Sequence, residues 1–357
     1  MSTGIRVEAV LSGRLAASSR FRVQQHVAPL AAHGIAVHAR PPRVSKYAAV
    51  PRSWRRLGPA ASPVLTGAKL ASRLPALTRS WGADLTWLER EVLPGRRTLE
   101  PLLHRPLLFD VDDAVWLFSD AHRRAVTAIA RQAACVLAGN DHIAEFFADA
   151  GAAVERVWTA IDTERFHPAS CQGAEPGPES GDGEFVVGWT GSRSALRYLA
   201  ALSPALGRFL DAVPEAVLLV MCDAEPVLPG VPPERVRFVP WSAEREAAAV
   251  RAMHVGVAPL PDRPWARGKC AFKMLQYMAA AVPVVASPVG MNAQVLHMAR
   301  VGTAAADDDA WFEALVELHG DGALRRSMGA EGRALAEREF AVPVIAGQLA
   351  SVMRRHA

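Results

Sequence analysis

Residues 259–290 read PLPDRPWARGKCAFKMLQYMAAAVPVVASPVG. The pattern predicts a strand end, a polar loop, an amphipathic helix, a strand that starts at a proline, and a Pro/Gly turn. Lys269, Lys273 and Gln276 have the spacing i, i+4, i+7, which predicts two cations and an amide on one face of that helix. The helix start also offers unpaired N–H groups and the positive end of the dipole. We therefore expect a diphosphate to bind here, although a solvated charged helix face has the same spacing.

The size and composition of the chain indicate an ordinary globular protein with two domains. It has 357 residues, of which 50% are apolar and 21% are charged. The net charge is +4, with an arginine excess in the first 60 positions at Arg14, Arg20, Arg22, Arg40, Arg43, Arg52, Arg55 and Arg56. No concentrated basic stripe with interleaved aromatics is present, so we expect no nucleic-acid partner. An anionic small ligand, or peripheral contact with an acidic membrane surface, fits this bias better.

The cysteines and the apolar runs favour a cytoplasmic location. Cys135, Cys171, Cys222 and Cys270 are too far apart for a metal knuckle or a CxxC pair, which is typical of a reducing compartment. The N-terminal residues do not have the pattern of a signal peptide. No stretch reaches 18 uninterrupted apolar residues, so we expect no membrane span.

One segment interrupts the pattern. Residues 168–184, PASCQGAEPGPESGDGE, are rich in proline, glycine, serine and acids, and they predict a linker. This linker would separate an N-terminal domain, residues 1–167, from a C-terminal domain, residues 185–340. A final helix from about Pro343 to Arg354, within residues 341–357, is expected to pack back on the first domain.

Each half alternates short apolar runs with helical patterns. The runs predicted to be strands are Ile5–Leu11, Ile35–Ala39, Asp84–Leu88, Leu107–Phe109, Val136–Ala138, Val154–Trp158, Phe185–Trp189, Val217–Met221, Val236–Val239, Val255–Pro259 and Val284–Ser287. Short apolar runs of this kind indicate parallel sheets that are covered on both faces. We therefore expect an α/β protein with two doubly wound, Rossmann-like domains that face each other across a cleft. Ligands of such sheets bind beyond the carboxyl ends of the strands.

The first predicted strand of the second half is followed by a candidate phosphate site. Gly191 permits a tight turn, and Ser192 and Ser194 are expected to cap the next helix. Arg193 and Arg197 lie in its first turns, where their guanidinium groups could bind a phosphate. A capped helix with surface arginines is the alternative interpretation.

Three acids follow a predicted strand of the first half, at Asp110, Asp112 and Asp113. They could bind Mg²⁺ through oxygen ligands, or they could cap a helix and face the cleft. Without a further acidic cluster, we predict no metal and no other cofactor.

Two further groups of residues are candidates for ligand binding. Ser18, Ser19, Arg20 and Arg22 follow the first strand and could hold an anionic or hydroxylated acceptor, or could form a loop with capping serines. Trp241 follows another strand and could stack on a nucleobase or simply pack.

These residues together resemble the GT-B glycosyltransferases, specifically the family 4 group of retaining enzymes that use nucleotide sugars. The resemblance covers nearly the whole chain. It is carried by GWTGSRSALRYL (188–199), VPWS (239–242) and the block 255–292, and in the first half by FDVDDAVW (109–116) and AIDTERFHP (160–168). The resemblance implies that the second domain binds the nucleotide sugar.

The resemblance also implies roles for individual residues. Gly191 and Ser192 match the glycine turn, Arg197 matches a basic residue that contacts the diphosphate, and Lys269 and Lys273 match the Gly-Lys loop and the lysine after it. Gln276 matches the second of two glutamates eight residues apart, which bonds the ribose. A glutamine can still donate and accept there.

The chain departs from the family pattern at several positions. The first glutamate of the pair falls at Gly268, and the glycine expected before the Val-Pro strand is Ala281. The loop after the first strand of the second domain has Arg193 and Ala195 in place of proline and threonine. The first domain has Ser18-Ser19-Arg20 where a Gly-Gly pair is often found.

The expected activity is transfer of a hexose or N-acetylhexosamine from a nucleoside diphosphate sugar, with UDP favoured, to a hydroxyl or amine. Lys269, Lys273, Arg193 and Arg197 would stabilise the departing diphosphate without a metal. Asp113, and with it Asp112, is expected to contact the reacting sugar or the acceptor. The acceptor could be a small molecule, a lipid-linked intermediate or a glycan, and the oligomeric state stays open. The alternatives are a partner protein that binds a nucleotide sugar without turnover, because the first glutamate is missing, and a nucleotide-sugar epimerase.

Overall fold

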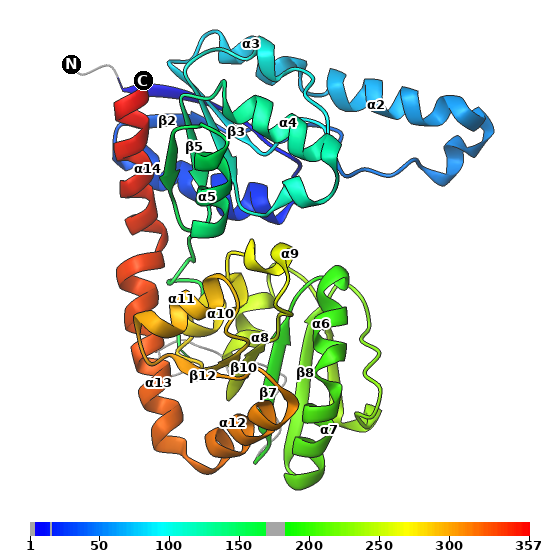
Figure 1. Cartoon of the computed structure of the whole chain (residues 1–357), viewed down its shortest axis with the longest axis vertical. Coiled ribbons are helices and arrows are strands. Elements are labelled where there is room, and N and C mark those ends of the chain that lie inside the picture. The colour runs from blue at the N-terminus through cyan, green and yellow to red at the C-terminus, as the bar shows by residue number, and fades with distance from the viewer. Residues whose placement is uncertain (1–3, 15, 169–182) are drawn as a thin grey trace. The chain divides into compact units, whose positions relative to one another are not determined.

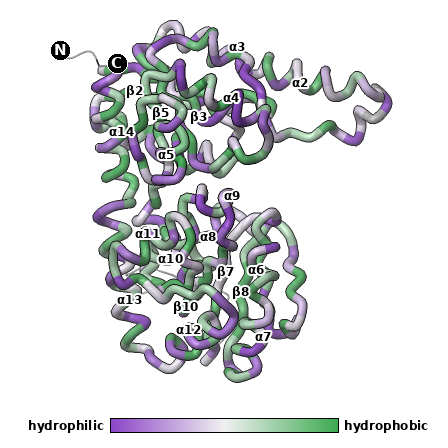
Figure 2. Tube along the Cα trace, viewed as in Figure 1, coloured by the Kyte–Doolittle hydropathy of each residue, from purple (hydrophilic) through white to green (hydrophobic). Residues whose placement is uncertain are grey.

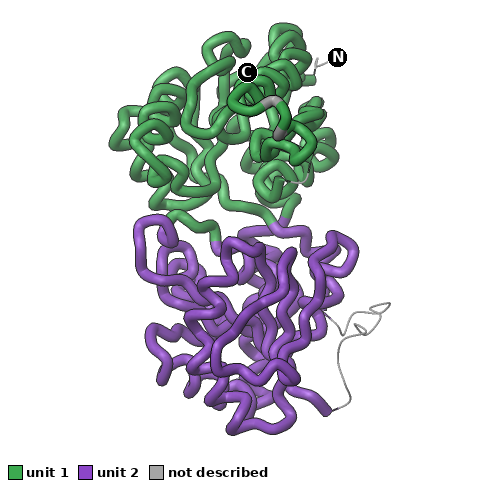
Figure 3. The backbone as a smooth tube through the Cα atoms, turned by 90° about the vertical axis from the view of Figure 1, so that its right-hand side faces the viewer, with its two compact units in different colours: residues 1–160, 268–270, 342–357 green, residues 161–267, 271–341 purple. Residues whose placement is uncertain are grey.

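A computed structural model describes residues 4–14, 16–168 and 183–357. They form two compact units (Figure 3): unit 1 contains residues 1–160, 268–270 and 342–357, and unit 2 contains residues 161–267 and 271–341. The linker predicted at residues 168–184 lies outside the described residues at positions 169–182.

Unit 1 is built on a six-stranded parallel sheet with the order β2-β1-β3-β4-β5-β6. The strands are β1 (Ile5–Val10), β2 (Ile35–His38), β3 (Leu85–Glu89), β4 (Leu107–Val111), β5 (Cys135–Ala138) and β6 (Val154–Arg156). Every residue of β3, β4 and β5 is buried, as expected for parallel strands that are covered on both faces. The strand order reverses between β1 and β3, which makes their carboxyl ends the switch point of this sheet.

Two helices of unit 1 begin at a side chain that caps them, Ser119 and Asn140. The helices of this unit are α1 (Val27–Ala32), α2 (Ala61–Ala71), α3 (Leu74–Ser80), α4 (Asp120–Ala130), α5 (Asp141–Asp149) and α14 (Val342–His356), with short helical turns η1 (Ser19–Val23), η2 (Gln24–His26), η3 (Arg52–Ala60), η4 (Glu100–Leu102) and η5 (Val115–Leu117). The Asn140 side chain accepts a hydrogen bond from the Ile143 amide at 2.9 Å and so caps α5. Helix α14 belongs to this unit because Ile345 and Leu349 share its apolar core.

Unit 2 contains a second six-stranded parallel sheet, with the order β12-β11-β10-β7-β8-β9 (Figure 1). The strands are β7 (Phe185–Thr190), β8 (Ala216–Cys222), β9 (Val236–Pro240), β10 (Val255–Ala258), β11 (Val284–Ala286) and β12 (Gly302–Ala304). The order reverses between β7 and β10, so the residues after these two strands lie at the switch point. The central strands of both sheets are strongly apolar (Figure 2).

The helices of unit 2 cover this sheet. They are α6 (Leu196–Ala201), α7 (Ser203–Ala212), α8 (Glu246–Arg251), α9 (Pro264–Arg267), α10 (Phe272–Ala279), α11 (Met291–Met298), α12 (Asp308–Gly320) and α13 (Gly322–Leu335), with the helical turns η6 (Arg193–Ala195), η7 (Pro233–Arg235) and η8 (Ala336–Phe340). Tyr277 of α10 packs so closely on β10 that a Cβ at Gly256 would lie 2.4 Å from its ring. Glycine at that position therefore lets the helix approach the strand.

The structure confirms the predicted α/β class with two parallel, doubly wound sheets. Each strand expected in the two halves is present, with ends displaced by one or two residues. The short strand β12 was missed because its three residues, GTA, have no apolar run to mark them. None of the described helices is both long and apolar enough to cross a bilayer.

Candidate functional site

The first candidate site lies in unit 2, at the turn that follows β7. The Gly191 amide donates to the Met221 carbonyl at 3.0 Å, and a Cβ at Gly191 would lie 2.4 Å from the Trp189 ring. The Lys273 ammonium lies 5.2 Å from the centre of the same ring, close enough for a cation–π contact. The buried indole therefore brings the glycine turn and one of the predicted cations to the same place.

The loop after this turn differs in detail from the prediction. Ser192 lies at the start of η6, but its side chain makes no capping hydrogen bond, and its hydroxyl instead lies 3.0 Å from that of Ser194. The Arg193 backbone amide donates to the Asp223 carboxylate at 2.6 Å, so an aspartate, and not a serine, binds the loop backbone. The prediction that these serines cap the helix was therefore wrong, because the carboxylate of Asp223, which follows β8, binds the loop amide instead. The side chains of Arg193 and Arg197 are exposed.

Helix α10 does not contain all three residues that the spacing placed on one face. It begins at Phe272, after Ala271, whose φ of 48° lies in the left-handed region and interrupts any helix from Lys269. Lys269 lies in the preceding loop, within unit 1, so its predicted place on the helix was wrong. Lys273 and Gln276 do lie on α10.

Gln276 is buried and belongs to a polar network inside unit 2. Its Oε1 accepts from the Thr190 hydroxyl at 3.1 Å, and its Nε2 donates to Glu246 at 3.0 Å. Glu246 also accepts from Arg165 at 2.9 Å and from the Trp241 indole at 3.3 Å. Trp241 is therefore held at its N–H group by an acid that sequence reasoning missed. No local motif distinguishes Glu246 from Glu244, the other acid in SAEREAAA (242–249).

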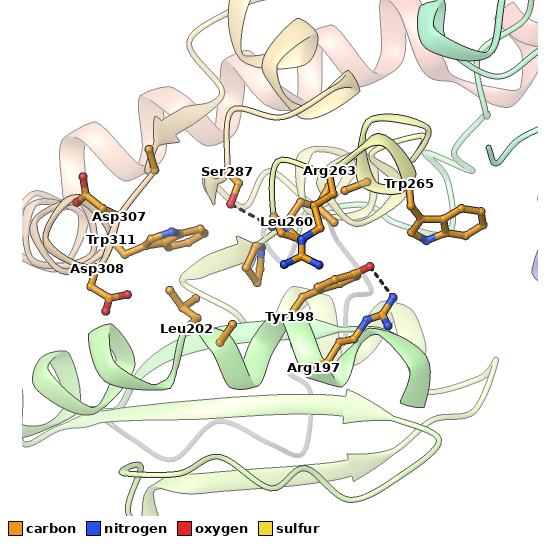
Figure 4. A pocket seen from close by; sticks show the side chains of 15 residues that line it. Arg197, Tyr198, Leu202, Leu260, Arg263, Trp265, Ser287, Asp307, Asp308 and Trp311 are labelled. Atoms are coloured by element: carbon orange, nitrogen blue, oxygen red, sulfur yellow. Dashed lines mark hydrogen bonds between the residues drawn. The ribbon is translucent and has the colours of Figure 1, made fainter. Parts of the chain in front are cut away.

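Unit 2 also has a cavity of about 570 Å³ at the carboxyl ends of β10 and β11. Its lining includes Arg197, Tyr198, Leu260, Arg263, Trp265, Ser287, Asp307, Asp308 and Trp311. Figure 4 shows the two aspartates at one end and Arg197 at the other, with Arg263 between them. The Arg197 guanidinium is bonded to the Tyr198 hydroxyl at 2.9 Å. The volume suits a ligand of nucleotide size, and the lining offers cations, aromatic faces and acceptors.

Arg197 is the one predicted donor residue among those that line this cavity. Trp265, Trp311 and Arg263 were missed by sequence reasoning. Arg263 and Trp265 lie in the stretch after β10 that was predicted to be a polar loop and that contains α9, so their position after a strand was an available signal. Trp311 lies on α12, more than a hundred residues from Arg197, and only the fold brings it here.

The second candidate site lies in unit 1, where Asp112 and Asp113 follow β4. Both carboxylates bond to Arg90, through its Nε to Asp112 and its Nη2 to Asp113, each at 2.6 Å. The Lys269 ammonium donates to the other oxygen of Asp113 at 3.0 Å. Arg90 follows β3 and has a φ of 56°, an uncommon value for a residue with a side chain and one typical of functional sites.

The two carboxylates have opposite electrostatic situations. Burial raises the pKa of Asp112, and the neighbouring Asp113 adds to this because two like charges oppose each other. Burial also acts to raise the pKa of Asp113, but Arg90 and Lys269 outweigh it and lower that pKa below the ordinary value. Asp113 is therefore ionised at neutral pH and is suited to accept a hydrogen bond rather than to give up a proton.

The loop 268–270 is tightly seated on unit 1. A Cβ at Gly268 would lie 2.4 Å from the Cβ of Ala114, so this position has no room for a side chain. The Asn140 amide donates to the Lys269 carbonyl at 3.1 Å, and Cys270 is buried with its thiol donating to the Asp112 carbonyl at 3.1 Å. These contacts fix the backbone on either side of Lys269.

The predicted acceptor residues divide into buried and partly exposed ones. The Ser19 hydroxyl donates to Glu89 at 2.6 Å, and Arg22 forms a fully buried ion pair with Asp110 at 2.7 Å. Ser18 is also buried, whereas Arg20 is partly exposed beside the Phe21 ring. Ser19 and Arg22 therefore organise the carboxyl ends of β1, β3 and β4. Within the described residues, no group of three or more side chains is placed to hold a metal.

Comparison with known proteins supports the interpretation of unit 2. Residues 185–321 match the family model described as glycosyl transferases group 1. No curated protein matches the chain by sequence.

Solved structures share the fold across the whole chain at low identity. Sucrose-phosphate synthase from Thermosynechococcus elongatus has a TM-score of 0.72 and 17% identity, covering 99% of this chain and 98% of that one. Anabaena HepE in complex with UDP and glucose has a TM-score of 0.67 and 14% identity, covering 98% and 99%. The N-terminal domain of Candida albicans trehalose-6-phosphate phosphatase has a TM-score of 0.66 and 12% identity, covering 100% and 97%. The chain thus has the fold of GT-B proteins, and its residues 185–321 match the group 1 glycosyl transferases.

Proposed function

We propose that this chain transfers a sugar from a nucleoside diphosphate sugar to a hydroxyl or amine acceptor. The observation that carries the proposal is that residues 185–321 match the group 1 glycosyl transferases and also contain the cavity at the switch point of unit 2. HepE has been solved with UDP and with UDP-glucose, which favours a UDP-sugar as the donor here. A hexosyl or N-acetylhexosaminyl group, retention of configuration, and independence of a metal complete the proposal.

In this proposal the diphosphate binds near the arginines of the unit 2 cavity. Arg197 and Arg263 offer two guanidinium groups, and the aromatic side chains Tyr198 and Trp311 offer faces for stacking. Asp307 and Asp308 at one end of the cavity could accept hydrogen bonds from sugar hydroxyls. The cavity thus offers each kind of contact that a nucleotide sugar needs.

The groups of unit 1 would act on transfer itself. Lys269 carries positive charge for a departing diphosphate, and its ammonium group is paired with Asp113 at 3.0 Å. Asp113 remains an acceptor at neutral pH and could orient an acceptor hydroxyl. No double-displacement nucleophile is required by this proposal.

A thermal-shift screen of UDP-, GDP- and dTDP-sugars tests donor binding. A ligand at a hundredfold excess over its Kd adds about 2.7 kcal/mol to the native state. We expect a UDP-sugar to raise the melting temperature and Arg197→Ala to abolish the shift. Arg208→Ala serves as the matched control, since Arg208 is an exposed arginine on α7 that does not line the cavity. The absence of a shift with every donor would refute the proposal.

A partner protein that binds the donor without turnover is the second candidate. It is favoured by Gly268, where the expected acid is missing and the contact with Ala114 leaves no space for one. Release of nucleoside diphosphate in the presence of a panel of acceptors distinguishes the two. Donor binding with neither transfer nor hydrolysis would support the partner protein.

A further inference from the structure

The charges of this chain are distributed very unevenly. Residues 9–83 contain no aspartate or glutamate but contain ten arginines and two lysines. This segment therefore carries a charge of +12, while the remainder of the chain carries −8, because the whole chain has +4. Such a separation indicates attraction to an extended anionic partner.

Some of these cations have structural tasks inside unit 1. Arg22 is paired with Asp110, Arg79 bonds to Glu8, and the buried Lys46 donates to the Glu91 carbonyl. Others are exposed at the surface: Arg14, Arg40, Arg43, Arg52 and Arg56. Ion pairs and hydrogen bonds inside unit 1 therefore explain only some of the basic residues in this segment.

Two of the exposed arginines lie on residues 47–71, which we call the basic arm. Figure 1 shows α2 and the turn before it extending away from the sheet of unit 1. Among the arm residues whose burial is described, only Ala61 and Leu65 are buried. Tyr47, Val50 and Val64 are exposed to 52%, 40% and 49%. The arm therefore presents both cations and apolar side chains to its surroundings.

This combination fits the surface of an anionic bilayer. Arginines are attracted to acidic lipid headgroups, and apolar side chains beside them can enter the boundary between headgroups and acyl chains. A nucleic acid would form ion pairs with the arginines, but it has no apolar layer in which the aliphatic side chains of Val50 and Val64 could be buried. We propose that the basic arm docks this protein peripherally on a membrane that contains anionic lipid. The proposal does not depend on glycosyl transfer.

The test uses the full chain with vesicles of phosphatidylcholine alone and vesicles with about 30% phosphatidylglycerol. We expect co-sedimentation with the anionic vesicles only. Raising the salt from about 50 mM to about 500 mM should weaken it, since exposed charges are then screened over a few ångströms. Equal binding to both vesicle types, or no binding to the anionic ones at low salt, would overturn the proposal.

Charge-reversal variants locate the surface. Arg52→Glu with Arg56→Glu should reduce partitioning onto anionic vesicles at least tenfold, because each basic side chain near the surface contributes about a fivefold gain in binding. Val50→Ser with Val64→Ser should reduce it by a smaller factor. The matched control, Arg124→Glu with Arg326→Glu, makes the same change in net charge at exposed arginines outside the arm. An equal loss in this control would show general electrostatics and contradict docking by the arm.

Two further readouts complete the test. Unchanged circular dichroism and melting temperature in the arm variants show that the loss is not caused by unfolding. Binding of duplex DNA or RNA that competes with the vesicles at equal charge concentration would overturn the choice of a bilayer. Because vesicle binding is measured without donor or acceptor, its failure is independent of any failure of transfer.

Discussion

Asp113 shows how one carboxylate can be set for a task by its neighbours. Arg90 and Lys269 each bond to one of its oxygens, and together they lower its pKa against the effect of burial. Asp112 accepts from the Nε of the same Arg90, but burial raises its pKa. The role of Lys269 in transfer can therefore be tested by replacing that residue alone.

Replacing Lys269 by alanine should reduce the turnover number by about a hundredfold, as is typical for the loss of one group that stabilises developing charge. The measurement is release of nucleoside diphosphate at saturating donor. Arg267→Ala is the matched control, because Arg267 is two residues away, exposed, and paired with Asp262. Turnover that stays at the level of the unmodified protein would remove the role of Lys269 in transfer.

The buried side chain of His26 is expected to make the stability of unit 1 sensitive to acid. Burial, assisted by Arg22, lowers the pKa of His26 to about 3, whereas an unfolded chain has about 6.5. Below pH 6.5 the unfolded state therefore binds a proton that the folded state does not bind. The contribution is complete above pH 6.5 and is lost as the pH falls towards 3, with a slope of about 1.4 kcal/mol per pH unit.

Denaturant unfolding of the unmodified protein and of His26→Gln, at several values between pH 7 and pH 4, measures this slope. We expect the variant to lose less stability over this range, because it has no side chain to protonate at that position. Parallel curves would show that His26 is protonated in the folded state.

At the scale of elements, the connection between α10 and β11 contains an alanine where glycine would fit better. Ala281 has a φ of 56°, a conformation that costs a residue with a Cβ about 1–2 kcal/mol. The carbonyl of Ala281 also approaches Gly329 of α13, where a Cβ would lie 2.1 Å from that oxygen. Two backbones therefore meet at this turn.

Ala281→Gly should stabilise the protein by about 0.5–1 kcal/mol, after the entropy cost of the more flexible unfolded chain. The measurement is the melting temperature, expected to rise by a few degrees. Gly329→Ala should lower it, because the added methyl group would clash with the turn. A lower melting temperature for Ala281→Gly would show that the turn has relaxed to suit alanine.

At the scale of the whole molecule, the two units have separate apolar cores. The core of unit 1 includes β1, β3 and α14, and the core of unit 2 includes β7, β8 and α12. A ligand that binds in the cavity of unit 2 stabilises first the unit that it contacts.

UDP at a hundredfold excess over its Kd should slow hydrogen exchange of core amides in β8 and β10 about a hundredfold. Core amides of β3 and β4 should change little if the units unfold independently. Mass spectrometry of peptides from the two units measures both effects in one sample. The same slowing in both units would show that they unfold together, and slowing in unit 1 alone would place the nucleotide elsewhere.

Much of the fold could be predicted from the sequence because its signals are local. Short apolar runs marked eleven of the twelve strands that the structure describes. The Gly191 turn was located because the glycine follows a strand directly. Spacing failed at Lys269, since one left-handed residue, Ala271, ends the periodicity on which the argument relied.

By itself, the sequence determined two parallel sheets and the positions that follow their strands, because hydrophobic period and turn chemistry act over a few residues. Only the tertiary structure decided which of these positions meet. Lys269 and Asp113 are 156 residues apart, and Gln276 and Glu246 are 30 apart. Such pairs depend on strand order and on the route of the chain, neither of which is written in any short stretch of residues.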